Sequence, residues 1–307
     1  MDIHPVVVGI DVSKARLDIF DGAASSCANT SQAIEPLARL WAGRGAFVVL
    51  EATGVYDRSL RQALQDHGVV HARVNPGRAR DFARAAGFLA KTDQVDARML
   101  AALGSALKPR AEPPGDPTRE QLAGLHRRRD QLVHVRQQER TRLKGCADPE
   151  IAEDIAQHLA WLDQAVRAME HRIAAAVSRS ETLKRQRQLL ASVPGIGPVA
   201  AATLMALVPE LGARSGKEIA AMAGLAPLNR DSGMHRGQRT IGGGRKRVRD
   251  ALYMAAVSAS RSHSRFAERY RHLIAAGKPP KLALIALARA ILVTANAVIR
   301  DQRAFQP

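Results

Sequence analysis

Short apolar runs separated by polar turns predict an α/β domain in the first third of the chain. Val6–Ile10 and 17–20 flank a polar turn, which is the pattern of a β-hairpin. Phe47–Glu51 is apolar up to its final acid and is typical of a strand inside a mixed sheet. A helical stretch over 58–67 and a strand over 69–74 follow. This order of elements predicts a sheet covered by helices.

The hydrophobic spacing becomes helical after a Pro-rich linker at 108–117. We expect one helix over 120–143, followed by a break in which Asp148 caps a second helix. Apolar residues then recur every three or four positions from Ile151 to Val177. This stripe predicts a helical hairpin or coiled coil, and an ordinary bundle helix fits the same spacing.

The predicted fold class is therefore α/β plus all-α, with three segments. They are an α/β domain over 1–107, a helical assembly segment over 118–186 and a helical domain over 187–307. The most apolar stretch, 282–299, contains Arg289 and Asn296, so we expect a packed helix and no membrane span.

Charge divides the chain unevenly. Residues 1–100 hold 12 Lys/Arg and 11 Asp/Glu, whereas the whole chain of 307 residues carries a net charge of +17. A strongly basic surface favours polyanions through the release of counterions, so we expect nucleic acid as a partner. Aromatic residues make up only 4% of the chain, which argues against single-strand binding by base stacking.

The two cysteines have neither the spacing of metal ligands nor that of a disulfide framework. The N-terminus also lacks the basic and apolar pattern of a signal peptide. We expect a protein of the reducing bacterial cytoplasm.

Four carboxylates stand where a metal-dependent nuclease needs them. Asp11 and Glu51 each end an apolar strand, and Asp93 and Asp96 share one face at the start of a helix. An acid at the end of a buried strand costs desolvation energy unless a partner compensates it. A divalent metal held by carboxylates is a common compensation and supports phosphoryl transfer. The quartet predicts a site that cuts polynucleotides.

The basic C-terminal region contains two glycine-rich segments. Gly195 and Gly197 lie in a Pro-Gly-Ile-Gly turn that resembles a helix-hairpin-helix motif, in which backbone N–H groups approach a phosphate. A plain turn between helices is the alternative. We expect nucleic-acid contacts from these two glycines and from basic side chains: Arg127, Arg128, Arg230, Arg236, Arg239, Arg245, Lys246 and Arg247.

Ser232 lies in this region among Arg230, Arg236 and Arg239. A serine in a turn is normally a turn former. A serine nucleophile attacking a phosphodiester, however, needs such cations to stabilise the transition state.

Taken in order, these motifs resemble the DEDD transposases, the bridge-RNA-guided insertion-sequence recombinases of the IS110 type. Gly9–Lys14, Glu51–Tyr56 and Lys91–Ala97 resemble the RuvC-like, ribonuclease-H-fold domain of that family. Val193–Gly197, Gly224–Pro227 and Ser232-Gly233 resemble its C-terminal transposase domain. The run Gly242–Gly243–Gly244 departs from the family pattern, which has a single glycine after a lysine there.

The resemblance implies a role for each matching residue. Asp11, Glu51, Asp93 and Asp96 would hold Mg²⁺, with Mn²⁺ as a substitute, and Ser232 would form a phosphoserine link to DNA. The metal site and the serine would join as one composite site in a dimer or tetramer assembled through the long helices. A structured noncoding RNA, the bridge RNA, would pair with donor and target DNA.

Two other functions remain open at the level of sequence. One is a junction-resolving nuclease that uses only the carboxylates. The other is a non-catalytic nucleic-acid-binding protein whose acids are ordinary strand-end and helix-start residues.

Overall fold

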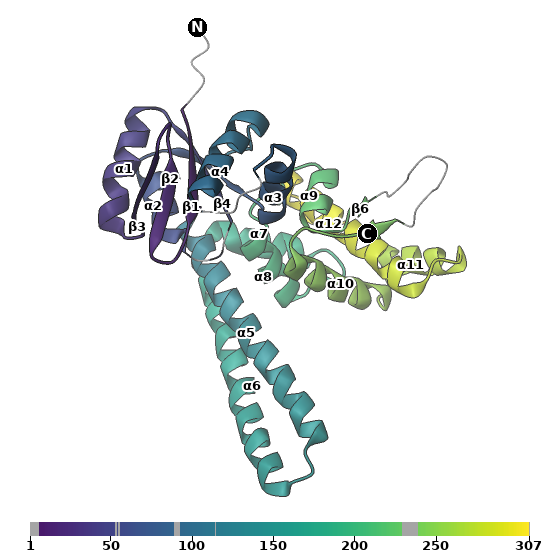
Figure 1. Cartoon of the computed structure of the whole chain (residues 1–307). Coiled ribbons are helices and arrows are strands. Elements are labelled where there is room, and N and C mark those ends of the chain that lie inside the picture. The colour runs from purple at the N-terminus through teal and green to yellow at the C-terminus, as the bar shows by residue number, and fades with distance from the viewer. Residues whose placement is uncertain are drawn as a thin grey trace. The chain divides into compact units, whose positions relative to one another are not determined.

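The chain folds into two units, Met1–Gly115 and Asp116–Pro307. The computed structural model describes residues 6–52, 54, 56–88, 93–113, 115–228 and 239–306 (Figure 1). Within these ranges the first unit contains a mixed sheet with helices, and the second is almost wholly helical.

The sheet of the first unit has five strands in the order β3-β2-β1-β4-β5. β1 pairs antiparallel with β2 and parallel with β4, and β4 pairs parallel with β5. The prediction of an α/β unit is confirmed. The strands are β1 (Val7–Val12), β2 (Arg16–Phe20), β3 (Ala24–Ala28), β4 (Phe47–Glu51) and β5 (Val70–Val74).

Helices cover both faces of this sheet. On one face α1 (Ser31–Gly43) and α2 (Arg58–Asp66) bury a cluster that includes Ile10, Trp41 and Leu50. On the other face α3 (Pro76–Ala85) and α4 (Asp93–Leu107) bury a second cluster around Val49 and Leu100. The central strands are therefore buried on both sides, which explains why β4 reads as an unbroken apolar run.

The sequence pattern missed two elements of the first unit. β3 is an edge strand of small and polar residues, most of them exposed, and it shows no apolar alternation. Asn75-Pro76-Gly77 directly follows β5 and has the composition of a turn. It instead begins α3, because the Asn75 side chain accepts a hydrogen bond from Gly77 N–H. Pro76 occupies the first turn of the helix, where a backbone N–H has no partner within the helix.

The helices of the second unit begin with a long pair. α5 (Pro117–Gly145) and α6 (Pro149–Ser178) run side by side as a hairpin (Figure 1). Asp148 caps α6 as predicted, accepting hydrogen bonds from Glu150 N–H and Ile151 N–H. The remaining helices are α7 (Glu181–Ala191), α8 (Pro198–Leu207), α9 (Gly216–Met222), α10 (Lys246–Ser260), α11 (Arg265–Ala275) and α12 (Pro280–Asp301).

One hydrophobic core joins the base of this hairpin to the other helices. Ile173 and Val177 of α6 pack in the same cluster as Leu204 of α8, Leu252 of α10 and Leu287 of α12. The segments 118–186 and 187–307, which the sequence pattern separates, consequently belong to one compact unit.

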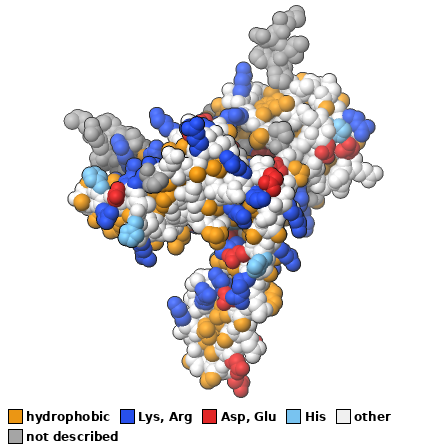
Figure 2. Space-filling view, turned by 180° about the vertical axis from the view of Figure 1, so that it is seen from behind, with side chains coloured by type: hydrophobic (Ala, Val, Ile, Leu, Met, Phe, Trp, Pro, Cys, Tyr) orange, Lys and Arg blue, Asp and Glu red, His pale blue; other side chains and the backbone are white. Residues whose placement is uncertain are grey.

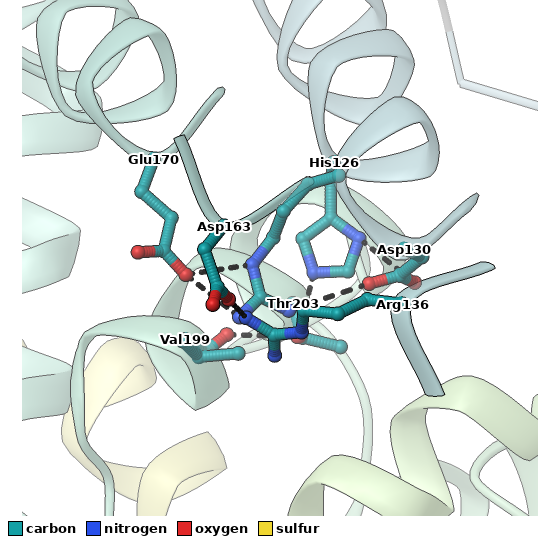
Figure 3. Close-up of polar contacts among 8 residues, drawn as sticks. His126, Asp130, Arg136, Asp163, Glu170, Val199 and Thr203 are labelled. Carbon is teal, nitrogen blue, oxygen red and sulfur yellow. Dashed lines mark hydrogen bonds and ion pairs between the residues drawn. The ribbon is translucent and has the colours of Figure 1, made fainter. Parts of the chain in front are cut away.

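A buried histidine links the hairpin to α8 and α10. His126 on α5 is 2% exposed, and its Nε2 lies 2.8 Å from Thr203 Oγ1, while Nδ1 lies 3.5 Å from Asp130 (Figure 3). Asp130 is also 3.3 Å from Arg247 of α10. Burial lowers the pKa of His126, against the attraction of Asp130, which raises it. The network fixes the base of the hairpin with polar contacts as well as apolar packing.

The helix α12 is long and apolar enough to cross a membrane by length and composition alone. Half of that stretch is buried inside the second unit, where Leu287, Ile291 and Ala295 contact the core. Buried Asn296 donates to Arg214 O and accepts from Gly212 N–H. These contacts match the expectation of a packed helix.

Candidate active site

Asp11 and Glu51 lie beside each other on neighbouring parallel strands. The pairing of β1 with β4 joins Ile10 to Leu50, and the two acids are the next residues along. Alternate residues of a strand share a face, so Asp11 lies on the face of Gly9, and Glu51 on that of Val49. This face is the one that α4 covers.

A glycine allows α4 to lie directly on β1. A Cβ at Gly9 would be 2.0 Å from Ala97 O and 2.4 Å from Ala101 N, both backbone atoms of α4. Gly104 makes a similar close approach, because a Cβ there would be 2.6 Å from Val7. The contact at Ala97 holds the preceding residue, Asp96, close to the end of β1.

Three of the predicted acids act electrostatically on the fourth, Asp11. Burial raises the pKa of Asp11, and the negative charges of Asp96, Asp93 and Glu51 raise it further, to about 6 from an ordinary 3.8. A backbone hydrogen bond with Val12 opposes this shift only weakly. Residues from β1, β4 and α4 therefore converge, although they lie 40 to 85 positions apart in the chain.

The charge of this cluster fits a divalent cation. Among the described residues, no three His, Cys, Asp or Glu side chains already form a metal-binding arrangement. The acids thus create a region of strongly negative potential, although their side chains are not yet arranged as a complete set of metal ligands. A cation would favour the ionised form of Asp11, and carboxylate oxygens are the ligands that Mg²⁺ prefers.

A fifth carboxylate, which the sequence pattern did not reveal, lies opposite Asp11. Asp18 of β2 pairs directly with Asp11 across the hairpin and is 2% exposed. Its charge is compensated within the same strand, because Arg16 Nε lies 3.1 Å from each of its carboxylate oxygens. An acid between buried Leu17 and Ile19 was the available signal.

The proposed nucleophile lies outside the described residues. Ser232, Arg230 and Arg236 fall in the segment 229–238, and Arg239, just after it, is exposed. The structure describes the residues that flank this segment. β6 (Pro227–Leu228) pairs antiparallel with β7 (Thr240–Ile241), which brings the two flanks together.

The departure from the family pattern at Gly242–Gly244 has a packing reason. Gly244 has a φ of +62°, and a Cβ on it would lie 2.3 Å from the backbone N of Gly224. Gly224 has a φ of +68°, and its own Cβ would be 2.3 Å from Gly243 O. The two backbone segments interlock just outside the β6–β7 pair, so this position excludes side chains.

The basic residues that begin α10 make contacts within the protein. Arg245 donates two hydrogen bonds of 2.7 Å to Glu210, and Lys246 lies 2.6 Å from Asp250. Arg247 pairs with Asp130. The sequence pattern assigned all three cations to nucleic acid, whereas the structure gives each one an acidic partner.

Among the other predicted contact residues, three are exposed and one packs closely against a helix. Arg127 and Arg128 are exposed on α5, and Gly197 is exposed at the start of α8. Gly195 instead packs against α10, where a Cβ would lie 2.3 Å from Ala255 O. The close approach at Gly195 thus serves helix packing.

Two family profiles match the chain. A DEDD transposase profile of the IS110 type matches residues 8–149, and a profile described as Transposase IS116/IS110/IS902 family matches residues 187–271. The pilin gene-inverting proteins of Moraxella bovis and Moraxella lacunata are each 30% identical over 97% of this chain and 97% of their own length. The chain belongs to the IS110 family of transposases.

This IS110-family transposase is therefore a DNA-cutting recombination enzyme. An insertion-element IS116 protein of Streptomyces clavuligerus is also similar, at 31% identity over 50% of this chain and 38% of its own length. Membership of the DEDD family implies dependence on a divalent metal, in keeping with the acid cluster at the end of β1 and β4.

Proposed function

We propose that this transposase cuts and rejoins DNA through a covalent bond between Ser232 and a DNA phosphate, assisted by Mg²⁺ at Asp11, Glu51, Asp93 and Asp96. The observation that carries the proposal is the convergence of the four acids, which is expressed in the raised pKa of Asp11. The order of strands β3-β2-β1-β4-β5, with acids on the two central strands, supports a RuvC-like ribonuclease-H fold.

In the proposed reaction, Ser232 Oγ bonds to phosphorus while the bond from phosphorus to one deoxyribose oxygen breaks. The proton that the serine loses balances the one that the leaving oxygen gains. Mg²⁺, when bound, polarises the phosphate and steadies the leaving oxygen. The bond energy stays in the phosphoserine link, so a second deoxyribose hydroxyl rejoins the strand by the reverse step. Asp11, Glu51, Asp93 and Asp96 would hold the metal. Arg230, Arg236 and Arg239, which lie near Ser232 in the sequence, would stabilise the negative charge of the transition state.

The alternative is a metal-dependent junction-resolving nuclease that uses the acids alone. The similarity to proteins named for gene inversion favours the recombinase, because inversion requires strands to be rejoined as well as cut. A nuclease that activates water loses the energy of the phosphodiester at each cut.

Replacing the serine separates these two functions. We expect Ser232→Ala to abolish both DNA cutting and any protein–DNA adduct, and Asp11→Asn to abolish both as well. A junction nuclease would continue to cut with Ser232→Ala and would lose activity only with Asp11→Asn. Binding of the same DNA by each variant, measured without metal, controls for misfolding.

We further propose that a structured noncoding RNA, transcribed beside the element, guides the enzyme to donor and target DNA. Delegating sequence choice to base pairing fits a protein whose cations are suited to backbone contacts. The Pro194–Gly197 turn, with Gly197 exposed at the start of α8, supports a helix-hairpin-helix-like contact to a phosphate backbone. Sequencing the RNA that copurifies tests guidance. Recombination in the absence of any enriched RNA would contradict it.

We also propose a composite site in a dimer or tetramer in the bacterial cytoplasm, in which the acids and Ser232 act on one phosphate. The α5–α6 hairpin is the candidate for assembly, because Ile151 and Trp161 on α6 are more than half exposed. Mixing Asp11→Asn with Ser232→Ala protein tests whether the site forms between subunits. Restored cutting supports assembly in trans, and no restoration contradicts it.

A further inference from the structure

Some cations of the second unit are already paired with acids. Those at the start of α10, Arg245, Lys246 and Arg247, each pair with an acid. Arg245 is held by two hydrogen bonds to Glu210 and is therefore less available to a phosphate. The pair of Lys246 with Asp250 is exposed, where an ion pair contributes little to stability.

Residues 261–281 hold a group of cations without acidic partners. This segment contains six Lys and Arg residues and one acid, Glu268. All six cations are exposed, and the described part of the chain offers no ion-pair partner to any of them: Arg261, Arg265, Arg269, Arg271, Lys278 and Lys281. Two exposed histidines, His263 and His272, lie in the same stretch.

The packing of α11 turns these side chains to solvent. Phe266 and Ala267 are buried, and Tyr270 packs against the core, so the opposite side of the helix is free. Arg269 and Arg271, two positions apart on the helix, are exposed at the two edges of that side. Lys, Arg and His side chains gather around an acidic one at the α11 end of the molecule, on the left of Figure 2.

The C-terminal tail holds the edge of this surface in place. The Arg265 guanidinium lies 4.5 Å from the centre of the Phe305 ring, and that ring stacks on Phe266. Phe305 N–H also donates a hydrogen bond of 2.8 Å to Ser192 Oγ. The exposed cations of α11 therefore project from a helix that packs on the core through one side and contacts the C-terminal tail at its N-terminal end.

We propose that the exposed face of α11 and its flanks, residues 261–281, is a contact surface for the phosphodiester backbone of duplex DNA. The segment presents cations without an exposed aromatic ring, because Phe266 is buried and Tyr270 is partly buried. Such a surface suits the regular backbone of a duplex and lacks the stacking platform that single strands use. DNA is the polyanion on which this family acts. The inference does not depend on Ser232 as the nucleophile.

Salt dependence of binding tests this surface directly. In the full-length protein we would change Arg269, Arg271 and Lys281 together to Gln and measure binding to a short duplex of arbitrary sequence. Each lost phosphate contact lowers the slope of log K against log salt by about 0.9, so we expect a decrease of about 2 to 3 and weaker binding at low salt. The thermal midpoint should stay unchanged because all three side chains are exposed.

A matched control removes the same charge elsewhere in the unit. Lys144, Arg179 and Lys217 are also exposed, and their change to Gln should leave the slope nearly unaltered. Equal weakening by both triple variants would overturn the proposal in favour of a general charge effect. An unchanged slope in the first triple variant would also overturn it. The proposal would likewise fail if that variant lost the binding of a hairpin RNA while its binding of duplex DNA stayed intact. Ser232→Ala, in contrast, should bind the duplex normally, so failure of the serine mechanism is a separate outcome.

Discussion

At the scale of single residues, Asp11 reports the chemistry of the acid cluster. Its pKa rises to about 6 because it is partly buried and faces three other carboxylates. The sequence placed Glu51 at a strand end and Asp93 and Asp96 at a helix start, as the structure has them. It placed Asp11 in the turn after a strand, whereas Asp11 lies inside β1, because the hairpin pairing continues to Val12. Asp18 between two apolar residues was a signal, but its pairing with Asp11 and with Arg16 depends on the register of the hairpin.

The raised pKa predicts how stability depends on pH and metal. The folded state holds the Asp11 proton more tightly than the unfolded chain, so the metal-free protein should lose stability as pH rises from about 4 to about 6. Mg²⁺ should then stabilise it well above pH 6 and little at pH 5, where protons compete. Thermal unfolding with EDTA and with Mg²⁺, at pH 5 and pH 8, measures both effects.

Asp11→Asn gives the matched variant for that measurement. It should remove most of the pH dependence between about 4 and 6, and it should weaken Mg²⁺ binding by more than the roughly 10–100-fold typical of an outer-shell partner. An equal Mg²⁺ effect on the variant and the wild type would contradict a metal site at Asp11.

At the scale of elements, close backbone contacts at glycines hold α4 on β1 and join the segments beside the β6–β7 pair. β1, β4 and the α5–α6 hairpin were predictable from hydrophobic spacing. The close approach of α4 to β1 was not, because a glycine in a strand carries no sign of what packs on it. The interlock of Gly224 with Gly244 is likewise a contact between distant segments that no local pattern encodes.

Gly9→Ala tests the contact between β1 and α4. The new Cβ would meet backbone atoms of Ala97 and Ala101, so α4 must shift and carry Asp96 with it. We expect a loss of about 1–3 kcal/mol in the free energy of unfolding and weaker Mg²⁺ binding. Denaturant unfolding and metal titration measure these changes. Gly43→Ala is the control, because a Cβ there meets nothing within 4 Å; a similar loss in both variants would refute the argument.

Glu210→Gln tests the anchor at the start of α10. Arg245 would lose a doubly hydrogen-bonded partner close to the β6–β7 pair, so we expect DNA cutting to fall about 10-fold while DNA affinity stays constant. The rate of DNA cutting and the affinity for DNA, both measured on the same DNA, test this expectation. Tighter DNA binding by Glu210→Gln would show that Arg245 binds nucleic acid once it is released. Lys246→Gln, which breaks only an exposed pair, should change neither quantity.

At the scale of the whole molecule, charge and chemistry are divided between the two units. The acid cluster lies in the first unit, whose part of the chain is nearly neutral, and the excess of basic residues lies mainly in the second. Sequence composition revealed this division. It could not tell which cations are already paired: Arg245, Lys246 and Arg247, which it assigned to nucleic acid, each have an acidic partner, whereas the six cations of residues 261–281 have none among the described residues.

We propose that the two units supply one reaction, with the metal at the acids and the nucleophile at Ser232. Mapping the protein–DNA bond tests it most directly. The full-length protein, its flanking transcript and Mg²⁺ would be incubated with element-end DNA, digested with nuclease and protease, and analysed by mass spectrometry. We predict a nucleotide phosphate on the peptide containing Ser232, absent from Asp11→Asn protein. Cut DNA with no attached peptide, or a nucleotide on a residue other than Ser232, would contradict the account.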